Sequence, residues 1–401
     1  MTSRAPRYDV AIVGGGMVGA VLAVALSRAQ FSVALVELRR PPEFDLDAPY
    51  DLRQSAIAPA PMRMLLQLDL WDYIAERRAC PFTGMLVWDE DSPAELLLEH
   101  TEIGIPELGH IVDNGLLVAS AWRHLQGVDV YCPAKLANLH VDTQAATLAL
   151  EDGRAITAAL VVGAEGGNSF VRQAAGIATT GWPYRQRCTV GQITTEYHHR
   201  NIAWQRYTQT GPVAFLPLGD GRCSLAWHAD DALADELAKL DEAAFCARLT
   251  AASDSALGQV LAIESRAQYP LRLLHAERYC LPRIALAGDA AHVVHPMAGQ
   301  GVNLGLLDVA ELVAALEAGR AAGHDAGELT YLKRYQRARM ADNLLMLGAT
   351  DVLKRTFGSR SPLVARLRGR AIDAAAGFAP IRQLMIHHAT GAGRTGPRLL
   401  R

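Results

Sequence analysis

The N-terminal residues of the chain carry the pattern that most constrains its fold. Tyr8–Val13 is a short apolar run with β-branched residues, which is typical of a buried strand. It leads directly into Gly14–Gly19, a loop of the form G-x-G-x-x-G. The apolar stretch Ala20–Ala29 predicts a helix, and Phe31–Val36 predicts a second strand that ends on Glu37. This order of strand, loop, helix, strand and acid predicts a βαβ unit that binds a nucleotide.

Each part of this unit has a physical reason. Gly14 permits a tight turn, Gly16 lets the backbone approach a pyrophosphate, and Gly19 lets the helix pack closely on the strand. Glu37 follows the second strand, where a ribose hydroxyl needs an acceptor. Gly391–Gly396 has the same glycine spacing, but no apolar strand precedes it and too few residues follow for a second unit. We therefore interpret it as part of a flexible basic tail without a function.

Two further junctions between a strand and a glycine turn occur later in the chain. The first, Gly163–Arg172, follows a predicted strand and contains Glu165. At the second, the apolar strand Ile284–Ala287 stops at Gly288–Asp289, and a helix is expected to begin at about Gly301–Asn303. A carboxylate at the tip of a strand can accept hydrogen bonds from ligand hydroxyls, and the N–H groups of such a turn can hold a ligand. Three such sites predict a long ligand with two ends.

We predict an α/β fold in which a Rossmann-like domain carries an inserted antiparallel β-sheet domain for the substrate and a helical C-terminus. The insertion is indicated at 181–271, where strands alternate apolar and polar residues before a helical stretch at 232–251. Residues 50–57 are interpreted as a loop and 112–125 as a helix. The expected divisions are 1–80, 101–180 and 272–345 for the nucleotide-binding domain, 81–100 (a hairpin) and 181–271 for the substrate domain, and 346–401 for a basic helical region.

Composition excludes several classes of protein. The formal net charge of −3 argues against a nucleic-acid binder. The six cysteines include no C-x-x-C pair, which excludes a dithiol redox centre of the usual spacing and fits a reducing cytoplasm. The uncharged run Val10–Leu26 is long enough to suggest a signal peptide, but its three consecutive glycines favour a strand, turn and helix. We expect a cytoplasmic protein without a transmembrane span.

The basic residues are concentrated at the C-terminus. From Asp351 to Arg401 the chain has ten Lys or Arg and two Asp, a balance of +8, which leaves −11 for residues 1–350. Within this segment cations alternate with apolar residues, as in a basic amphipathic helix. Such a helix can lie on anionic lipid at the inner face of the membrane or contact a biosynthetic complex, and a solvated terminal helix is an equally good interpretation.

The three motifs in this order resemble the FAD-dependent aromatic hydroxylases, which are single-component flavoprotein monooxygenases. The stretch His295–Asp308 is similar to the signature of the ubiquinone-biosynthesis hydroxylases within that group. Two other segments also resemble this branch: Asp51-x-Arg53-x-x-Ala56, and Gly211–Leu218 together with Trp227. The resemblance covers nearly the whole chain.

The resemblance implies FAD as the cofactor and assigns residues to it. Gly14, Gly16 and Gly19 are expected at the pyrophosphate, Glu37 at the adenosine ribose, Arg53 near the isoalloxazine and Asp289 at the ribityl chain. The turn from Pro296 to Asn303 is expected at the pyrimidine edge of the flavin. The family usually has Asp where this chain has Glu165. The full set of expected cofactor-binding residues is Gly14, Gly16, Gly19, Glu37, Arg53, Glu165, Gly288, Asp289, Pro296, Gly299, Gln300, Gly301 and Asn303.

The resemblance also implies the reaction. The expected activity is hydroxylation of the ring of a prenylated phenol in ubiquinone biosynthesis, with NAD(P)H as co-substrate, O2 and a flavin hydroperoxide. Two alternatives remain open: a flavin hydroxylase or oxidoreductase for another aromatic or lipid substrate, and a non-catalytic FAD-binding subunit of a biosynthetic complex. No second genuine dinucleotide fingerprint is present, which fits transient binding of NAD(P)H.

No catalytic residue and no oligomeric state can be assigned from the sequence. Arg206, Tyr207, His228 and Tyr269 are candidates on the predicted substrate sheet, whereas Trp227 and Phe215 are expected in its core. His292 and His295 follow Asp289 at a spacing that metal ligands can have. The Gly/Pro-rich turn around them favours a flavin site instead, so we predict no metal.

Overall fold

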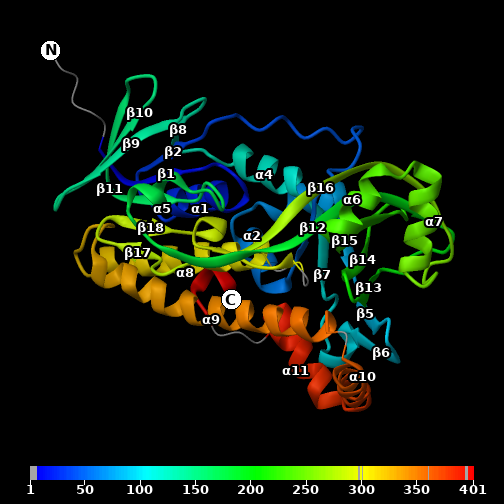
Figure 1. The fold of residues 1–401 in the computed structure, drawn as a ribbon. Coiled ribbons are helices and arrows are strands. Elements are labelled where there is room, and N and C mark those ends of the chain that lie inside the picture. The colour runs from blue at the N-terminus through cyan, green and yellow to red at the C-terminus, as the bar shows by residue number, and fades with distance from the viewer. Residues whose placement is uncertain (1–6, 297–298, 300, 360, 393–395) are drawn as a thin grey trace.

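Two eight-stranded sheets form the framework of the protein (Figure 1). The computed structural model describes residues 7–296, 299, 301–359, 361–392 and 396–401. Two long strands, β12 (Thr179–Thr195) and β16 (Val260–Ala276), extend from the region of the first sheet into the second. The expected divisions at 180/181 and 271/272 therefore fall inside strands. No change in composition marks the point where a continuous strand passes from one region to the other.

The first sheet has the Rossmann-like arrangement, with the strand order β17–β18–β11–β1–β2–β8. Its neighbours from β18 to β8 are parallel, and β10 joins β11 to β9. Near-continuous apolar runs are buried in its central strands, as parallel sheets require. The strands are β1 (Arg7–Val13), β2 (Val33–Val36), β8 (Val128–Tyr131), β9 (Leu136–Val141), β10 (Ala146–Leu150), β11 (Ala155–Gly163), β17 (Cys280–Leu281) and β18 (Ile284–Leu286).

The helices of this region follow the glycine junctions. α1 (Met17–Arg28) begins after Gly16, and α8 (Gly301–Ala321) follows the third junction and packs against α1. A short helix, α5 (Phe170–Ala174), follows the second junction. Other helices of the first region are α2 (Pro59–Gln67), α3 (Trp71–Arg78) and α4 (Asn114–Arg123), and the short 3-10 helices are η1 (His100–Ile103), η2 (Gly288–Ala290) and η4 (Arg398–Leu400).

The second sheet has the order β19–β16–β12–β15–β14–β13–β5–β6 and is antiparallel except between β13 and β5. One face packs on α6 (Asp231–Lys239) and α7 (Glu242–Ala252), and its core contains Trp227 and Phe215, as expected. The predicted helix at 232–251 is divided, because Asp241 caps α7 by accepting a hydrogen bond from the Ala244 N–H. The remaining strands are β5 (Gly84–Asp89), β6 (Ser92–Glu99), β13 (Ile202–Thr208), β14 (Gly211–Pro217), β15 (Cys223–Asp230) and β19 (His292–Val293).

A small sheet with the order β3–β7–β4 lies beside these two. It corrects two predictions. The second half of the expected loop at 50–57 is β3 (Gln54–Ile57), and the expected helix at 112–125 starts only at Asn114, after β7 (Gly109–Asp113). Both errors have one cause: these short segments become strands by pairing with each other and with β4 (Ala79–Phe82), which is distant in sequence.

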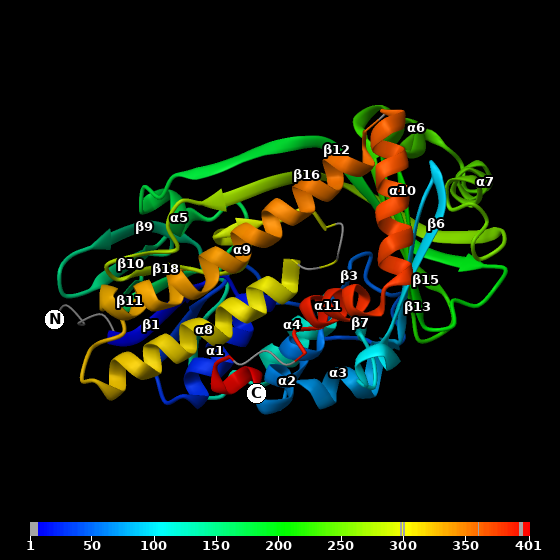
Figure 2. The same cartoon turned by 90° about the horizontal axis from the view of Figure 1, so that it is seen from below.

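Three helices form the C-terminal region, and Figure 2 shows them on the underside of the molecule. α9 (Leu329–Phe357) doubles back along α8, α10 (Pro362–Gly377) stands beside β6, and α11 (Ala379–Thr390) packs on η1. The expected division at 345/346 falls inside α9. Among the helices described, none combines the length and apolar character that a membrane crossing requires.

The expected basic amphipathic helix over 351–370 is not continuous. α9 ends at Phe357 and Pro362 starts α10, so the segment belongs to two helices. Arg368 is buried, and its guanidinium forms ion pairs with Asp89 at 2.6 Å and Asp91 at 2.8 Å. This cation therefore fastens α10 to the β5–β6 hairpin instead of facing solvent.

Candidate active site

The three glycine junctions meet at the edge of the first sheet. Gly14 has a φ of +100°, and a Cβ there would lie 2.6 Å from the Ala164 oxygen of the second junction. A Cβ on Gly19 would lie 1.9 Å from the Gly14 oxygen. The first junction can therefore close on itself and on the second one only because both positions lack a side chain.

The third junction contacts the first through Val18. A Cβ on Gly288, which has a φ of +60°, would lie 3.0 Å from this side chain, and one on Gly305 would lie 2.5 Å from it. Gly305 belongs to α8, so the helix after the third junction packs directly on the helix after the first. Residues almost three hundred positions apart in sequence thus share one corner of the fold.

The Glu37 side chain forms a hydrogen bond with the backbone of the first glycine loop. Its Oε2 accepts a hydrogen bond from the Gly15 N–H at 2.5 Å, and its Oε1 accepts one from the Arg39 N–H at 3.0 Å. On the other side of the loop, the Trp122 indole donates to the Gly15 oxygen at 2.7 Å. Sequence reasoning missed Trp122, because a tryptophan in a helix gives no sign that it contacts a distant loop.

A cavity of about 940 Å³ opens beside these junctions and extends under the second sheet. A Cβ on Gly16 would meet nothing within 4 Å, so the backbone of the loop borders open space. This is the feature that a close approach of phosphate requires. The expected cofactor residues that line the cavity are Gly14, Gly16, Glu37, Arg53, Glu165, Asp289, Pro296, Gly299 and Gly301.

Asp289 and Arg53 present charged groups to this cavity. The Asp289 carboxylate has no hydrogen-bond partner within the described part of the chain, so its oxygens can accept from a ligand. Although the Asp289 side chain is exposed to the cavity, desolvation by the surrounding protein raises its pKa, and electrostatic interactions with His292, Arg53 and Arg272 oppose this effect. The Arg53 guanidinium lies 4.9 Å from the centre of the Tyr269 ring. Arg272, which also lines the cavity, was not singled out from the sequence.

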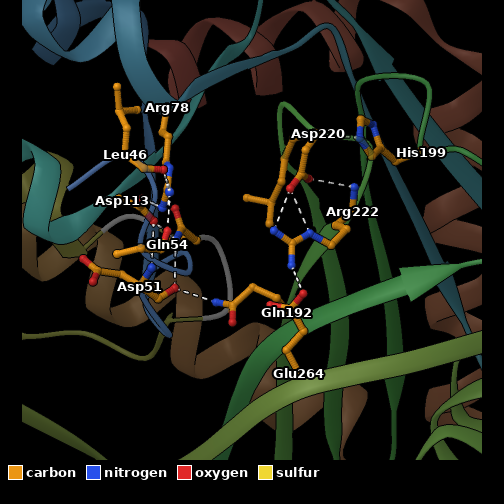
Figure 3. Close-up of polar contacts among 12 residues, drawn as sticks. Leu46, Asp51, Gln54, Arg78, Asp113, Gln192, His199, Asp220, Arg222 and Glu264 are labelled. Atoms are coloured by element: carbon orange, nitrogen blue, oxygen red, sulfur yellow. Dashed lines mark hydrogen bonds and ion pairs between the residues drawn. The ribbon is translucent and has the colours of Figure 1, made fainter. Parts of the chain in front are cut away.

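The loop before β3 holds Arg53 in place through a buried polar network (Figure 3). The Asp113 carboxylate accepts hydrogen bonds from the Asp51 N–H at 3.1 Å and from the Gln54 amide, and it pairs with Arg78 at 3.5 Å. Burial raises the pKa of Asp113. From the second sheet, Gln192 donates to the Asp51 oxygen at 2.6 Å. The loop is therefore tied to both the small sheet and the substrate sheet.

Arg78 extends this network to the start of the loop. Its guanidinium also donates to the carbonyl oxygens of Leu46 and Ala48. Figure 3 shows a second cluster on the neighbouring sheet, where Arg222 bridges Asp220 and Glu264. Sequence reasoning identified the Asp51–Ala56 motif but missed Asp113 and Arg78, because both become partners of the loop only through the fold.

Glu165 is turned toward the beginning of α5. Its Oε1 accepts a hydrogen bond from the Val171 N–H at 2.7 Å, while its other oxygen is enclosed without a partner among the described residues. Burial raises the pKa of this carboxyl group. The longer side chain found in place of the expected Asp thus reaches a backbone donor of the protein itself.

The third motif divides into residues that line the cavity and residues that support it. Asn303 does not line the cavity: its amide donates to the Ala56 oxygen at 2.8 Å, and its oxygen accepts from the Ala58 N–H at 3.0 Å. Its side chain therefore ties α8 to the end of β3. Gly19 and Gly288 are packing positions and do not line the cavity either. Gln300, which was expected at the flavin, lies outside the described residues.

His292 belongs to a buried ion-pair network. Its Nε2 lies 2.6 Å from Asp308 Oδ2, and the same oxygen accepts from the Gly288 N–H at 3.0 Å. Asp308 Oδ1 pairs with the Arg339 Nε at 2.8 Å. Burial alone would raise the pKa of Asp308, but its contacts with His292 and Arg339 together hold the pKa below its ordinary value. Within the described residues no group of side chains has the arrangement of a metal site.

The second sheet forms the roof of the cavity. On β15, the alternating residues Ser224, Ala226 and His228 all line it, and Ala226 lies directly opposite Ala214 on β14. Two small side chains facing each other leave room beneath the sheet. Of the candidate residues on this sheet, His228 and Tyr269 line the cavity, whereas Arg206 and Tyr207 do not.

Known proteins resemble this chain in sequence and in fold. A family model described as FAD binding domain matches residues 7–345. The 3-demethoxyubiquinol 3-hydroxylase of Escherichia coli (strain K12) is 36% identical over 386 residues, covering 96% of this chain and 98% of that protein. The ubiquinone hydroxylase UbiL of Rhodospirillum rubrum is 38% identical over 399 residues, covering 98% of this chain and 92% of that protein.

Solved structures agree on the fold. PqsL of Pseudomonas aeruginosa, a probable FAD-dependent monooxygenase, matches with a TM-score of 0.77 at 23% identity and covers 92% of this chain and 99% of its own. The p-nitrophenol 4-monooxygenase PnpA of Pseudomonas putida also matches with a TM-score of 0.77, at 19% identity. The match covers 96% of this chain and 98% of the PnpA chain. At these identities the likeness shows the fold alone.

A nucleotide-binding edge that opens under an antiparallel sheet defines an FAD-dependent monooxygenase. Within that class, the chain belongs to the aromatic hydroxylases of the ubiquinone-biosynthesis hydroxylase family. The family resemblance, the α/β fold and the use of FAD inferred from the sequence are thus confirmed, and NAD(P)H is the usual reductant of the related hydroxylases.

Proposed function

We propose that this enzyme hydroxylates the aromatic ring of a prenylated phenol in ubiquinone biosynthesis, using NAD(P)H and O2. The observation that carries the proposal is one continuous cavity, which begins at the Gly14–Gly19 loop and ends beneath Ala214 and Ala226. A phenol ring beneath the sheet would lie in the same enclosure as a flavin bound along the three junctions. The names of the relatives at 36% and 38% identity support a ubiquinone precursor as the substrate.

The residues present fit FAD. In this proposal the open backbone at Gly16 takes the pyrophosphate, Glu37 accepts from the adenosine ribose, and the unpaired Asp289 carboxylate accepts from the ribityl hydroxyls. Arg53 and the turn that includes Pro296 and Gly299 border the isoalloxazine. Gly19, Gly288 and Asn303 support this arrangement from outside the cavity.

The chemistry that bound FAD supplies is reduction by NAD(P)H followed by activation of dioxygen for transfer of one oxygen atom to the ring. The protein contributes position and a dry environment. The loop that holds Arg53 is fixed by Asp113 and Gln192, and the apolar underside of the sheet excludes water from the ring. Water exclusion directs the activated oxygen to the substrate instead of to peroxide release.

The test is turnover with labelled dioxygen. Purified protein loaded with FAD should consume NADH or NADPH faster when an ortho-prenylated phenol is added, and mass spectrometry should find one labelled oxygen atom in the ring of the product. A protein that retains FAD but never accelerates NAD(P)H oxidation would favour a non-catalytic subunit. Faster turnover of short soluble phenols than of prenylated ones would favour another substrate class.

We also propose that α9–α11 contact an anionic membrane surface, from which a polyprenylated substrate would be drawn. Three exposed cations, Arg355, Arg366 and Arg370, accompany the exposed apolar side chains of these helices. Basic charge beside an apolar face favours anionic lipid over an acidic, polar protein. The apolar residues, here called the apolar ridge, are Leu344, Leu345, Val352, Leu353, Leu363, Leu367, Phe378, Ile381, Leu384 and Met385.

Substitution of the ridge should weaken vesicle binding and leave the flavin site unchanged. The triple variant Leu345→Gln, Val352→Gln and Leu367→Gln alters side chains that are 63%, 62% and 56% exposed. We expect its recovery with vesicles containing phosphatidylglycerol to fall about tenfold, since several leucine-sized groups no longer enter the interface. The matched control is Leu261→Gln, an equally exposed leucine on β16. Unchanged recovery, or a wild-type dimer that the variant converts to a monomer, would contradict the membrane proposal.

A further inference from the structure

His228 lies on β15 and is 2% exposed. It lines the cavity together with Ser224 and Ala226, which precede it on the same face of the strand. Both ring nitrogens are enclosed and have no hydrogen-bond partner among the described residues. A neutral imidazole always carries one donor and one acceptor, and each left unpaired costs about 1–3 kcal/mol. Such a side chain is expected to gain a partner when the cavity is filled.

The neighbours of His228 do not supply that partner. Cys188 lies opposite it on β12, and its thiol is directed to the Thr189 oxygen at 3.9 Å. The His295 ring stands edge-on to His228 with centroids 5.2 Å apart, and its Nε2 is engaged by Gln186 at 3.3 Å. The adjoining ring and thiol therefore leave both nitrogens of His228 without a partner among the described residues, and the Nδ1 of His295 is enclosed and unpaired there as well.

The space next to His228 suits an aromatic ring. The side chains that precede His228 on this face of β15 belong to Ser224 and Ala226, and both are small. Ala226 lies opposite Ala214 on β14 and opposite Val190 on β12. Tyr269 on β16 lies opposite Cys188 on β12, so His228, Cys188 and Tyr269 form one row across the sheet. A planar ring held under the alanines would bring a substituent on its edge to the imidazole.

We propose that His228 forms the hydrogen bond that recognises the ring hydroxyl of the substrate. This assignment rests on the proposed function, because it requires a phenol in the cavity. It adds a specificity residue to the site: an analogue without the hydroxyl would leave the buried imidazole unpaired, and sites of this kind discriminate strongly against such analogues.

The acidity of the imidazole limits its role to hydrogen bonding. Burial lowers the pKa of His228 to about 4, whereas a phenol has a pKa of about 10. Full transfer of the phenol proton to His228 would therefore be strongly unfavourable. The side chain is neutral at physiological pH, so it orients the hydroxyl and polarises it without removing its proton.

The experiment compares two probes on the oxidised FAD-loaded enzyme: an ortho-prenylated phenol and the corresponding prenylbenzene, which lacks the hydroxyl. Binding is followed through the change in flavin absorbance, so turnover is not required. The wild type should bind the phenol about tenfold more tightly than prenylbenzene. His228→Phe preserves a ring and removes the unpaired nitrogens, so we expect it to fold, to bind prenylbenzene normally and to lose the preference.

Two further variants complete the comparison. His228→Gln retains a donor and an acceptor and should keep part of the preference even if the Phe variant does not fold. His140→Phe changes an exposed histidine on β9 that does not line the cavity, and it should behave as wild type. Full preference in His228→Phe, or complete loss of it in His228→Gln, would overturn the assignment.

The assignment and the proposed function can fail separately. If the wild type inserts oxygen into the phenol but binds both probes equally, His228 does not recognise the hydroxyl and the proposed function stands. If the wild type neither binds nor oxygenates any prenylated phenol, the proposed function is wrong and the role of His228 falls with it.

Discussion

Replacing Gly19 by alanine is expected to prevent the N-terminal βαβ unit from closing and to abolish flavin binding. The added Cβ would lie 1.9 Å from the Gly14 oxygen and 3.2 Å from the Ala164 side chain. The first of these contacts is with the backbone, so no side-chain rotation relieves it. We expect the free energy of unfolding to fall by about 3 kcal/mol, at the upper end of the usual cost of overpacking. Denaturant titration and flavin absorbance after desalting measure the two effects.

Gly16→Ala is the matched control for this prediction. A Cβ on Gly16 meets no atom of the described residues within 4 Å, and the φ of −71° suits alanine. The stability of the flavin-free protein should therefore stay within about 0.5 kcal/mol of wild type. The flavin affinity should nevertheless fall about 10- to 100-fold, because the methyl group keeps the pyrophosphate from the backbone N–H groups. Normal flavin retention by Gly16→Ala would mean that the pyrophosphate lies elsewhere.

Asp308→Asn should have a large effect even though Asp308 does not line the cavity. The substitution removes the buried charged partner of Arg339, which is 1% exposed, and leaves this cation with only the partly exposed Asp342; it also weakens the contact with His292. Breaking a buried ion pair from one side costs about 3–5 kcal/mol. The same carboxylate accepts the Gly288 N–H, so the turn that presents Asp289 should loosen as well. We expect a lower denaturation midpoint together with weaker flavin retention.

Asp342→Asn tests whether the burial of Asp308 is the reason for the large loss of stability expected in Asp308→Asn. Asp342 pairs with the same Arg339 at 3.2 Å, but its side chain is 41% exposed. Its neutralisation should cost no more than about 1 kcal/mol, the usual worth of a solvent-accessible pair. Equal losses in the two variants would show that the charge of Arg339, and not the burial of Asp308, decides the effect.

The regular elements of the nucleotide-binding edge could be predicted because their causes are local. Three junctions join an apolar strand to a glycine turn, and the residues of each junction show this pattern within a short stretch of sequence. The tail motif Gly391–Gly396 has the same glycine spacing but not the local pattern around it. Gly391 is the left-handed cap of α11, with a φ of +64°, and starts no βαβ unit. Its flanking residues lack the apolar strand that a genuine unit needs.

The predictions that failed concern segments whose state depends on distant partners. β3 and β7 are strands because they pair with each other, and Arg368 is buried because α10 lies against the β5–β6 hairpin. The expected place of Asn303 at the flavin remains a prediction, but the hydrogen bonds of its side chain to the backbone of Ala56 and Ala58 are likewise a product of the tertiary structure. No periodicity in the chain contains this information.

By itself, then, the sequence indicated the class of the protein and its cofactor through the family resemblance of its motifs. It also located the glycines of the three junctions, since steric limits on φ and on close approach act within a few residues. Only the tertiary structure decided which side chains serve the cavity and which support it. Trp122 reaches Gly15, Glu165 turns to α5, and His228 lies beside Ala226 and opposite Cys188 because strand register and helix packing bring them there. Those contacts join residues that are far apart in the chain, and long-range packing, not local preference, sets their geometry.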